Sequence, residues 1–157
     1  MDRKIKGYTI LEILVVISLM IILSYIGVKE FLVYVAKIRL NSAVDQLLGD
    51  LNWIKTKSMI SEKPWGFCVE NENSYVLFKD NDSDGNCDEN EIERRINLSN
   101  QYPGVKIYDS TYMCENNHFL IYNRSGRVYT LWGNIILINQ YNEIKTITIS
   151  EFGINVS

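Results

Sequence analysis

From Tyr8 to Val28 the chain reads YTILEILVVISLMIILSYIGV, and this stretch decides how the rest of it can be arranged. Its 21 residues are apolar almost throughout, with one acid, Glu12, and no base. A helix rises about 1.5 Å per residue, so a helix of this length covers the roughly 30 Å of a bilayer's hydrocarbon core. We therefore predict a transmembrane helix over residues 8–28.

The charges before this stretch predict its orientation. Arg3, Lys4 and Lys6 precede it, and basic residues tend to stay on the cytoplasmic side of a membrane. The N-terminus is therefore expected in the cytoplasm and everything after Val28 outside it. A cleavable secretory signal is the alternative, but the stretch is longer than an ordinary signal core and no Ala-x-Ala-like cleavage site follows it.

The apolar pattern continues beyond the span with a helical period. Aliphatic residues recur at spacings of three and four, at Leu40, Val44, Leu47, Leu48, Leu51 and Ile54. The first proline is Pro64, which supplies a stop signal. We predict one helix from about Thr9 to Ile60, with residues 29–63 forming an amphipathic segment that continues into a globular domain.

Residues 64–157 have the texture of a β-rich domain. Short runs of β-branched and aromatic residues alternate with turn formers, including Asn71–Asn73, Ser125-Gly126 and Gly133-Asn134. The predicted strands are Trp65–Val69, Ser74–Phe78, Glu91–Leu98, Val105–Tyr108, His118–Tyr122, Val128–Trp132, Asn134–Ile138 and Ile144–Ser150. A helix followed by strands predicts an α+β fold in which the long helix packs on an antiparallel sheet.

The residues around the start of the apolar stretch carry a specific motif. Lys6-Gly7-Tyr8-Thr9-Ile10-Leu11-Glu12 resembles the prepilin signature of type IV pilins and type II secretion pseudopilins. The resemblance implies that a prepilin peptidase removes a leader, residues 1–7, by cutting between Gly7 and Tyr8, and methylates the new N-terminus. It also implies that Glu12 meets the amino group of a neighbouring subunit inside a filament, where the low dielectric strengthens such a pair.

The order of helix and strands resembles the GspH/FimT-type minor pseudopilins, as do Asn123–Val128, Gly133–Leu137 and Ile147–Ser150. The resemblance implies a non-enzymatic subunit of a type II secretion pseudopilus or type IV pilus, held in the bacterial inner membrane. Its expected partners are the prepilin peptidase, other pilins or pseudopilins, an inner-membrane assembly platform and membrane lipid. A major pilin or pseudopilin subunit and a membrane-anchored calcium-dependent enzyme are the alternatives.

Charge and composition narrow the remaining functions. The chain has 157 residues, 46% of them hydrophobic, and a net charge of −3, which excludes a disordered chain and disfavours a basic nucleic-acid binder. Some FimT-like relatives bind DNA through basic C-terminal residues, but residues 149–157 contain no base. Because affinity for phosphate needs Lys or Arg, DNA binding is not expected.

The acidity is concentrated between Lys79 and Arg95, where there are seven acids and three bases. Residues 80–91, DNDSDGNCDENE, fit the calcium-loop pattern D-x-[DN]-x-[DN]-G-x₅-E. The predicted Ca²⁺ ligands are Asp80, Asp82, Asp84, the carbonyl of Asn86, Asp88 through water, and a bidentate Glu91. The flanks are predicted strands rather than the helices of an EF-hand, so a solvated hairpin tip is the alternative.

Three cysteines, Cys68, Cys87 and Cys114, allow at most one intramolecular disulfide. An exported domain favours oxidation. We expect the loop residues Cys87 and Cys114 to pair, and Cys68, in a predicted strand, to be a small buried apolar side chain. His118 is the only histidine, which excludes a multi-histidine metal site.

Overall fold

The structure is a computed structural model that describes residues 8–61, 63–151 and 153–157. It contains one long helix, α1 (Ile10–Ile60), and a short one, α2 (Leu98–Gln101), with two 3₁₀ turns, η1 (Glu89–Glu91) and η2 (Cys114–Asn116). The strands are β1 (Trp65–Asn71), β2 (Ser74–Lys79), β3 (Ile92–Asn97), β4 (Val105–Ser110), β5 (Leu120–Tyr122), β6 (Gly133–Asn139), β7 (Ile144–Ser150) and β8 (Gly153–Val156). The chain divides into two compact units, one ending at Val35 and one covering Ala36–Ser157.

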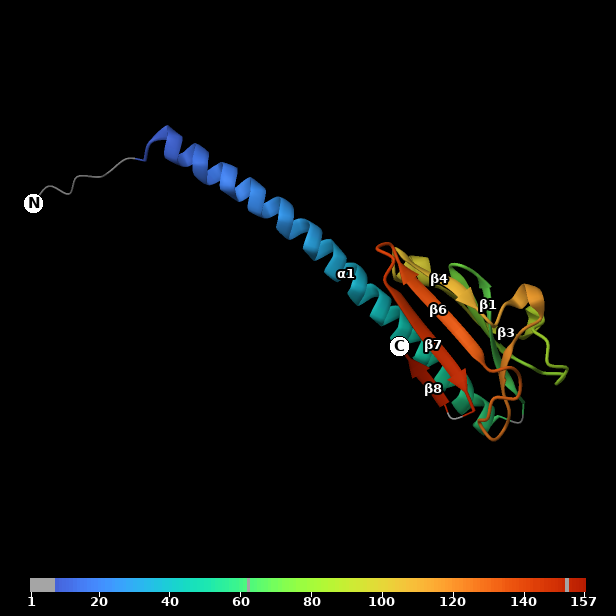
Figure 1. Cartoon of the computed structure of the whole chain (residues 1–157). Coiled ribbons are helices and arrows are strands. Elements are labelled where there is room, and N and C mark those ends of the chain that lie inside the picture. Colours follow the sequence, from blue (N-terminus) through green and yellow to red (C-terminus); the bar gives the residue numbers. More distant parts are fainter. Residues whose placement is uncertain (1–7, 62, 152) are drawn as a thin grey trace, which may run out of the picture. The chain divides into compact units, whose positions relative to one another are not determined.

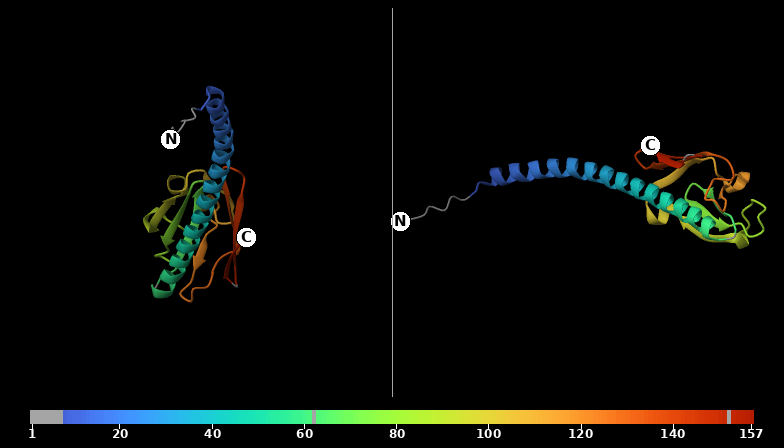
Figure 2. Two further views of the ribbon diagram at one scale, coloured as in Figure 1. Left: turned by 90° about the vertical axis from the view of Figure 1, so that its left-hand side faces the viewer. Right: turned by 90° about the horizontal axis from the view of Figure 1, so that it is seen from below.

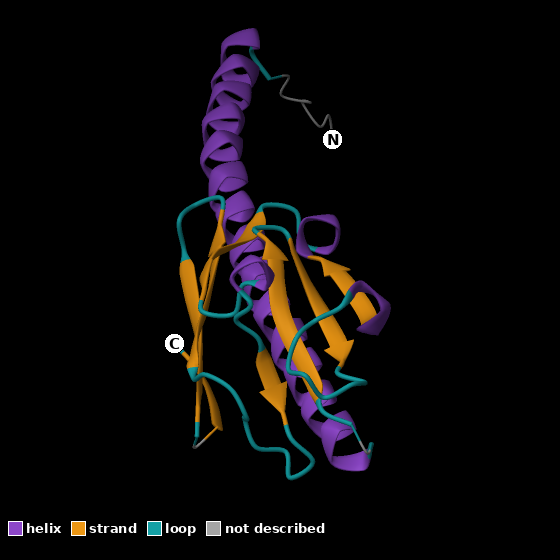
Figure 3. Cartoon of the chain, turned by 90° about the vertical axis from the view of Figure 1, so that its right-hand side faces the viewer, coloured by secondary structure: helices purple, strands orange, loops and turns teal. Residues whose placement is uncertain are grey.

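The second unit contains two four-stranded antiparallel sheets (Figures 1 and 3). One sheet has the order β3-β2-β1-β5 and the other the order β4-β6-β7-β8. The part of α1 that belongs to this unit runs alongside the strands, as the teal helix shows from two further directions in Figure 2. The predicted α+β fold, a long helix packed on antiparallel β-structure, is confirmed.

The main core lies between this part of α1 and the inner faces of both sheets. Leu40, Leu47, Leu51 and Ile54 are fully buried there, together with strand residues from both sheets such as Ile135. Spacings of three and four place the helical residues on one face, and burying one such side chain contributes about 2 kcal/mol. The predicted apolar face of the helix is therefore the face that packs on the sheets.

The β3-β2-β1-β5 sheet also has a smaller core on its opposite face. Cys68, Val76, Phe78, Phe119 and Ile121 form this outer cluster, and the side chains of Cys87, Ile92 and Cys114 pack against it. The ring of Phe78 lies where a Cβ on Gly66 would be, so only glycine leaves room for it. β1 and β2 are therefore buried on both faces.

In the C-terminal half two sequence predictions are wrong and one strand was not predicted. Residues 128–132 form no strand beyond one isolated bridge between Tyr122 and Val128. One backbone bond remains, from the N–H of Tyr129 to the Ile121 carbonyl at 2.7 Å. The hydroxyl of Thr130 stops the pairing there, because it accepts the N–H of Ile121 at 3.1 Å and donates to the Phe119 carbonyl at 2.6 Å. Gly133-Asn134 is not a turn but the start of β6, and β8 pairs with β7 where no strand was predicted.

The disulfide joins Cys68 to Cys114, so the predicted Cys87–Cys114 pair is wrong. The backbone N–H of Val69 donates to the Tyr112 carbonyl at 2.7 Å, and Val69 forms a parallel bridge with Met113. These contacts bring the segment that enters η2 beside β1 and leave the Cα atoms of Cys68 and Cys114 5.3 Å apart. Cys87 is the unpaired cysteine of the described residues and is half-buried.

A polar cluster joins α1 to the β3-β2-β1-β5 sheet. The Tyr75 hydroxyl on β2 donates to Asp50 Oδ2 of α1 at 2.7 Å, and Arg94 of β3 donates to Asp50 Oδ1 at 3.2 Å. Burial and the neighbouring Asp50 carboxylate raise the pKa of Tyr75 far above its ordinary value. Arg94 also lies over the Trp53 ring, 5.5 Å from its centroid.

Asp50→Ala is expected to lower the free energy of unfolding by about 2–3 kcal/mol, because it leaves the buried Tyr75 hydroxyl without its acceptor. Urea unfolding of the full chain in detergent measures this value. Asp45→Ala, which removes an exposed acid of the same helix, is the matched control and is expected to change stability by less than about 0.5 kcal/mol. Equal losses in the two variants would contradict a stabilising role for the cluster.

Candidate functional site

The first turn of α1 carries the described part of the predicted prepilin motif. Gly7 and the rest of the predicted leader lie outside the described residues, whereas Tyr8 is described and exposed. Thr9 caps the helix, because its Oγ1 accepts the backbone N–H of Glu12 at 3.2 Å. Glu12 is exposed in the first turn, where the helix dipole favours an acid. None of the ion pairs formed by the described residues involves Glu12.

The first unit exposes an almost purely apolar helical surface. Large side chains from Ile10 to Leu32, among them Leu14, Met20 and Phe31, are about half exposed or more. Among the described residues, α1 is the one helix long and apolar enough to cross a membrane. Such a surface is stable in lipid or against other apolar helices.

The acidic loop, residues 80–91, joins β2 to β3 and brings three of its predicted metal ligands together. Carboxylate oxygens of Asp80, Asp82 and Asp84 lie within 4.8 Å of one another. The loop turns sharply at Ser83 and Gly85, whose φ angles are 63° and 81°. At Gly85 this left-handed conformation costs nothing, because glycine has no Cβ.

Asp80 differs from the other two acids because it is buried, with 2% of its surface exposed. Its Oδ2 accepts the N–H of Gly85 at 3.1 Å, while Oδ1 is buried without a hydrogen-bond partner in the described part of the chain. Burial raises the pKa of Asp80, and the nearby carboxylates of Glu91 and Asp84 raise it further. Asp84 is exposed, and hydrogen bonds from Asn86 lower its pKa.

The remaining predicted ligands lie at the base of the loop. Glu91 is buried, and its Oε1 accepts the N–H of Asn81 at 2.6 Å. Asp88 is the residue before η1 and, like Glu91, lies outside the converging group of three acids. Asn86 donates its N–H to Asp84 Oδ1 at 2.8 Å. The structure therefore brings together Asp80, Asp82 and Asp84, and Glu91 ties the loop's two ends.

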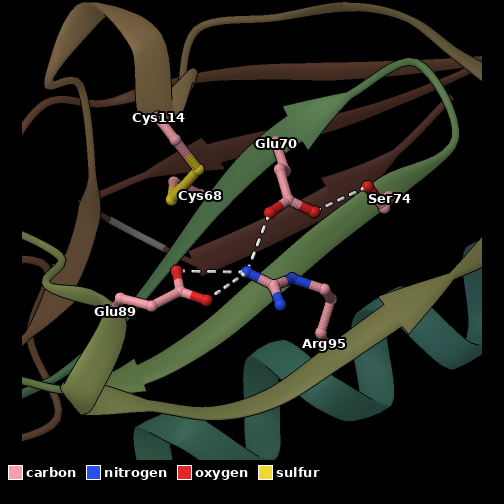
Figure 4. Close-up of polar contacts among 6 residues, drawn as sticks. All are labelled: Cys68, Glu70, Ser74, Glu89, Arg95 and Cys114. Atoms are coloured by element: carbon pink, nitrogen blue, oxygen red, sulfur yellow. Dashed lines mark hydrogen bonds and ion pairs between the residues drawn. A yellow bond between two sulfur atoms is a disulfide. The ribbon is translucent and has the colours of Figure 1, made fainter.

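An ion-pair network anchors the exit of the loop to the sheet (Figure 4). Arg95 Nη2 on β3 lies 3.0 Å from Glu70 Oε1 on β1 and 3.1 Å from Glu89 Oε1 of η1. Glu70 Oε2 in turn accepts the Ser74 hydroxyl at 3.0 Å. Sequence reasoning missed this network, because its members come together only through strand pairing.

Cys87 anchors the middle of the loop. Its side chain packs against the outer cluster, at the motif position that an aliphatic residue usually fills. Burial, with the nearby acids Glu91, Asp88 and Glu89, raises the pKa of Cys87 to about 12. Cys87 is therefore a neutral, partly buried thiol at neutral pH.

The whole chain was compared with known proteins. No family model matches it, and no curated protein matches it. Among solved structures it is similar to the minor pseudopilin EpsH from the type 2 secretion system of Vibrio cholerae. The two share 14% sequence identity and superpose with a TM-score of 0.51, over 78% of this chain and 95% of EpsH. At this identity the likeness shows a similar fold alone.

Proposed function

We propose that this protein is a minor pseudopilin or pilin subunit, anchored in the bacterial inner membrane and assembled through its N-terminal helix. The observation that carries the proposal is the exposed apolar helix with one acid, Glu12, in its first turn that forms no ion pair with another described residue, attached to a pseudopilin-like fold. An isolated chain has no described partner for this acid. A filament of parallel subunits would supply one, together with apolar helices that cover the exposed surface.

In this proposal residues 8–28 hold the subunit in the membrane before assembly, with the N-terminus in the cytoplasm. Prepilin peptidase cuts between Gly7 and Tyr8 and methylates the new N-terminus. The mature subunit then leaves the lipid through an inner-membrane assembly platform and joins other pilins or pseudopilins. The likeness to EpsH favours a minor subunit of a secretion pseudopilus over a major subunit.

Gly7→Ala is expected to leave the protein as an uncut precursor, because a scissile glycine lets the peptidase approach the backbone closely. The measurement is the mass of the N-terminus after expression in cells that hold a prepilin peptidase. In the unaltered chain, the mature protein is expected to begin at Tyr8.

Gly27→Ala is the matched control for this experiment. A Cβ on Gly27 meets nothing within 4 Å, and alanine favours a helix by about 1 kcal/mol over glycine. This variant should be processed normally. A Gly7→Ala chain that begins at Tyr8, or an unaltered chain that is never cut, would contradict the proposed processing.

A further inference from the structure

We propose that the acidic loop is a calcium site in which the buried carboxylate of Asp80 is the central ligand. The proposal goes beyond assembly, since it concerns the purified subunit and requires no filament. The candidate ligands that converge are Asp80, Asp82 and Asp84, whose carboxylate oxygens lie within 4.8 Å of one another. Clustered acids alone are common on protein surfaces and carry no conclusion.

The independent observation is the state of Asp80 itself. Its surface is 98% covered, and Oδ1 has no hydrogen-bond partner among residues 8–61, 63–151 and 153–157. A buried carboxylate oxygen without a partner is strongly unfavourable, and a bound cation removes this cost. In a hairpin tip built only for solvent, this oxygen would face water instead.

The chemistry of the cluster favours calcium among the common metals. All three converging side chains offer carboxylate oxygen, and oxygen ligands select Ca²⁺ or Mg²⁺ over zinc or copper. Mg²⁺ demands a nearly ideal octahedron, whereas Ca²⁺ accepts the irregular, oxygen-rich shell of a loop with this spacing. Asn86, Asp88 and Glu91 remain the ligands that the motif predicts in addition.

The surroundings of the three acids give the binding of a cation a structural consequence. Asp80, Asp84 and Gly85 border a hollow of about 270 Å³ that Tyr129 also lines. Cys87 packs the loop against the outer cluster, and the pair of Glu89 with Arg95 ties the loop's exit to β3. A bound cation would therefore stabilise the whole region between β2 and β3 by linking these anchors.

The test uses the full chain in detergent, stripped of metal with a chelator. At 10 mM Ca²⁺ the expected increase in Tm is about 5 °C, for a site as weak as those of extracellular modules. Calorimetry should give one Ca²⁺ per chain, and the same concentration of Mg²⁺ should raise Tm by less than about 1 °C. Calcium should also slow alkylation of Cys87 severalfold, which reports on the loop alone.

Asp82→Ala and Asp84→Ala remove the side-chain oxygens of exposed ligands and are expected to abolish both responses. Glu93→Gln is the matched control, because it removes one exposed acid beside the loop that is not a proposed ligand. It should keep the full calcium response. The proposal is overturned if no binding occurs at 10 mM Ca²⁺, if Mg²⁺ acts equally, or if both alanine variants respond like the unaltered chain.

Discussion

Glu12→Ala is expected to leave the protein processed and membrane-bound but to reduce its amount in assembled filaments about a hundredfold or more. In the proposed filament the Glu12 carboxylate pairs with the methylated N-terminal amine of a neighbour inside a bundle of apolar helices. Removing one partner of a buried ion pair costs about 3–5 kcal/mol, and each 1.4 kcal/mol is roughly a factor of ten. The measurement is the ratio of the subunit in the sheared extracellular fraction to that in the membrane fraction.

Glu30→Ala is the control for this prediction, because it removes an exposed acid of the same helix at the far end of the apolar stretch. It should assemble at nearly the normal level. N-terminal masses of both variants distinguish a defect in assembly from one in processing. Normal incorporation of Glu12→Ala would show that the acid has no role in subunit contacts.

Cys68→Ala and Cys114→Ala are each expected to destabilise the oxidised chain by about 4 kcal/mol. The disulfide closes a loop of 46 residues, and this value is the loop-closure entropy that it removes from the unfolded chain. It also fastens η2 to the outer cluster beneath the acidic loop. Urea unfolding in detergent, with and without reductant, measures the loss.

Cys87→Ala is the matched control and should cost less than about 1 kcal/mol, since it replaces a small, half-buried side chain by another. Alkylation of the unreduced, denatured chain should modify one cysteine, and peptide mapping should find the label on Cys87. A label on Cys68, with Cys87→Ala as the destabilised variant, would establish the other pairing.

The long helix could be predicted because its signals are local. Twenty-one nearly uncharged residues, then Leu40, Leu47 and Leu51 on one face, specify a helix whatever it packs against. The acidic loop could be located for the same reason, since the residues that supply its predicted ligand oxygens lie at fixed spacings within twelve consecutive positions. The strands Trp65–Asn71 and Ser74–Lys79 were predicted within two residues of their ends, because both are short apolar runs between turn formers.

Contacts between distant segments could not be predicted. The strand pairing that places Val69 beside Met113 selects Cys68 as the partner of Cys114. The hydroxyl of Thr130 takes two of the backbone groups, the Ile121 N–H and the Phe119 carbonyl, that a strand over residues 128–132 would need. Neither the disulfide pairing nor the bonding of Thr130 can be recognised from the spacing of residues, because each depends on which faces of which strands meet.

The candidate metal site combines local features, which can be predicted from the sequence, with contacts to distant segments, which cannot. Which acids share a loop, and at what spacing, can be read from the sequence, since a tight turn holds consecutive residues close together. Tertiary packing buries Asp80, leaves one of its oxygens without a partner among the described residues, and lets Cys87 and Arg95 fasten the loop to the sheet. Burial and anchoring arise from packing against distant segments. The affinity of an acidic loop for a cation therefore depends on that packing.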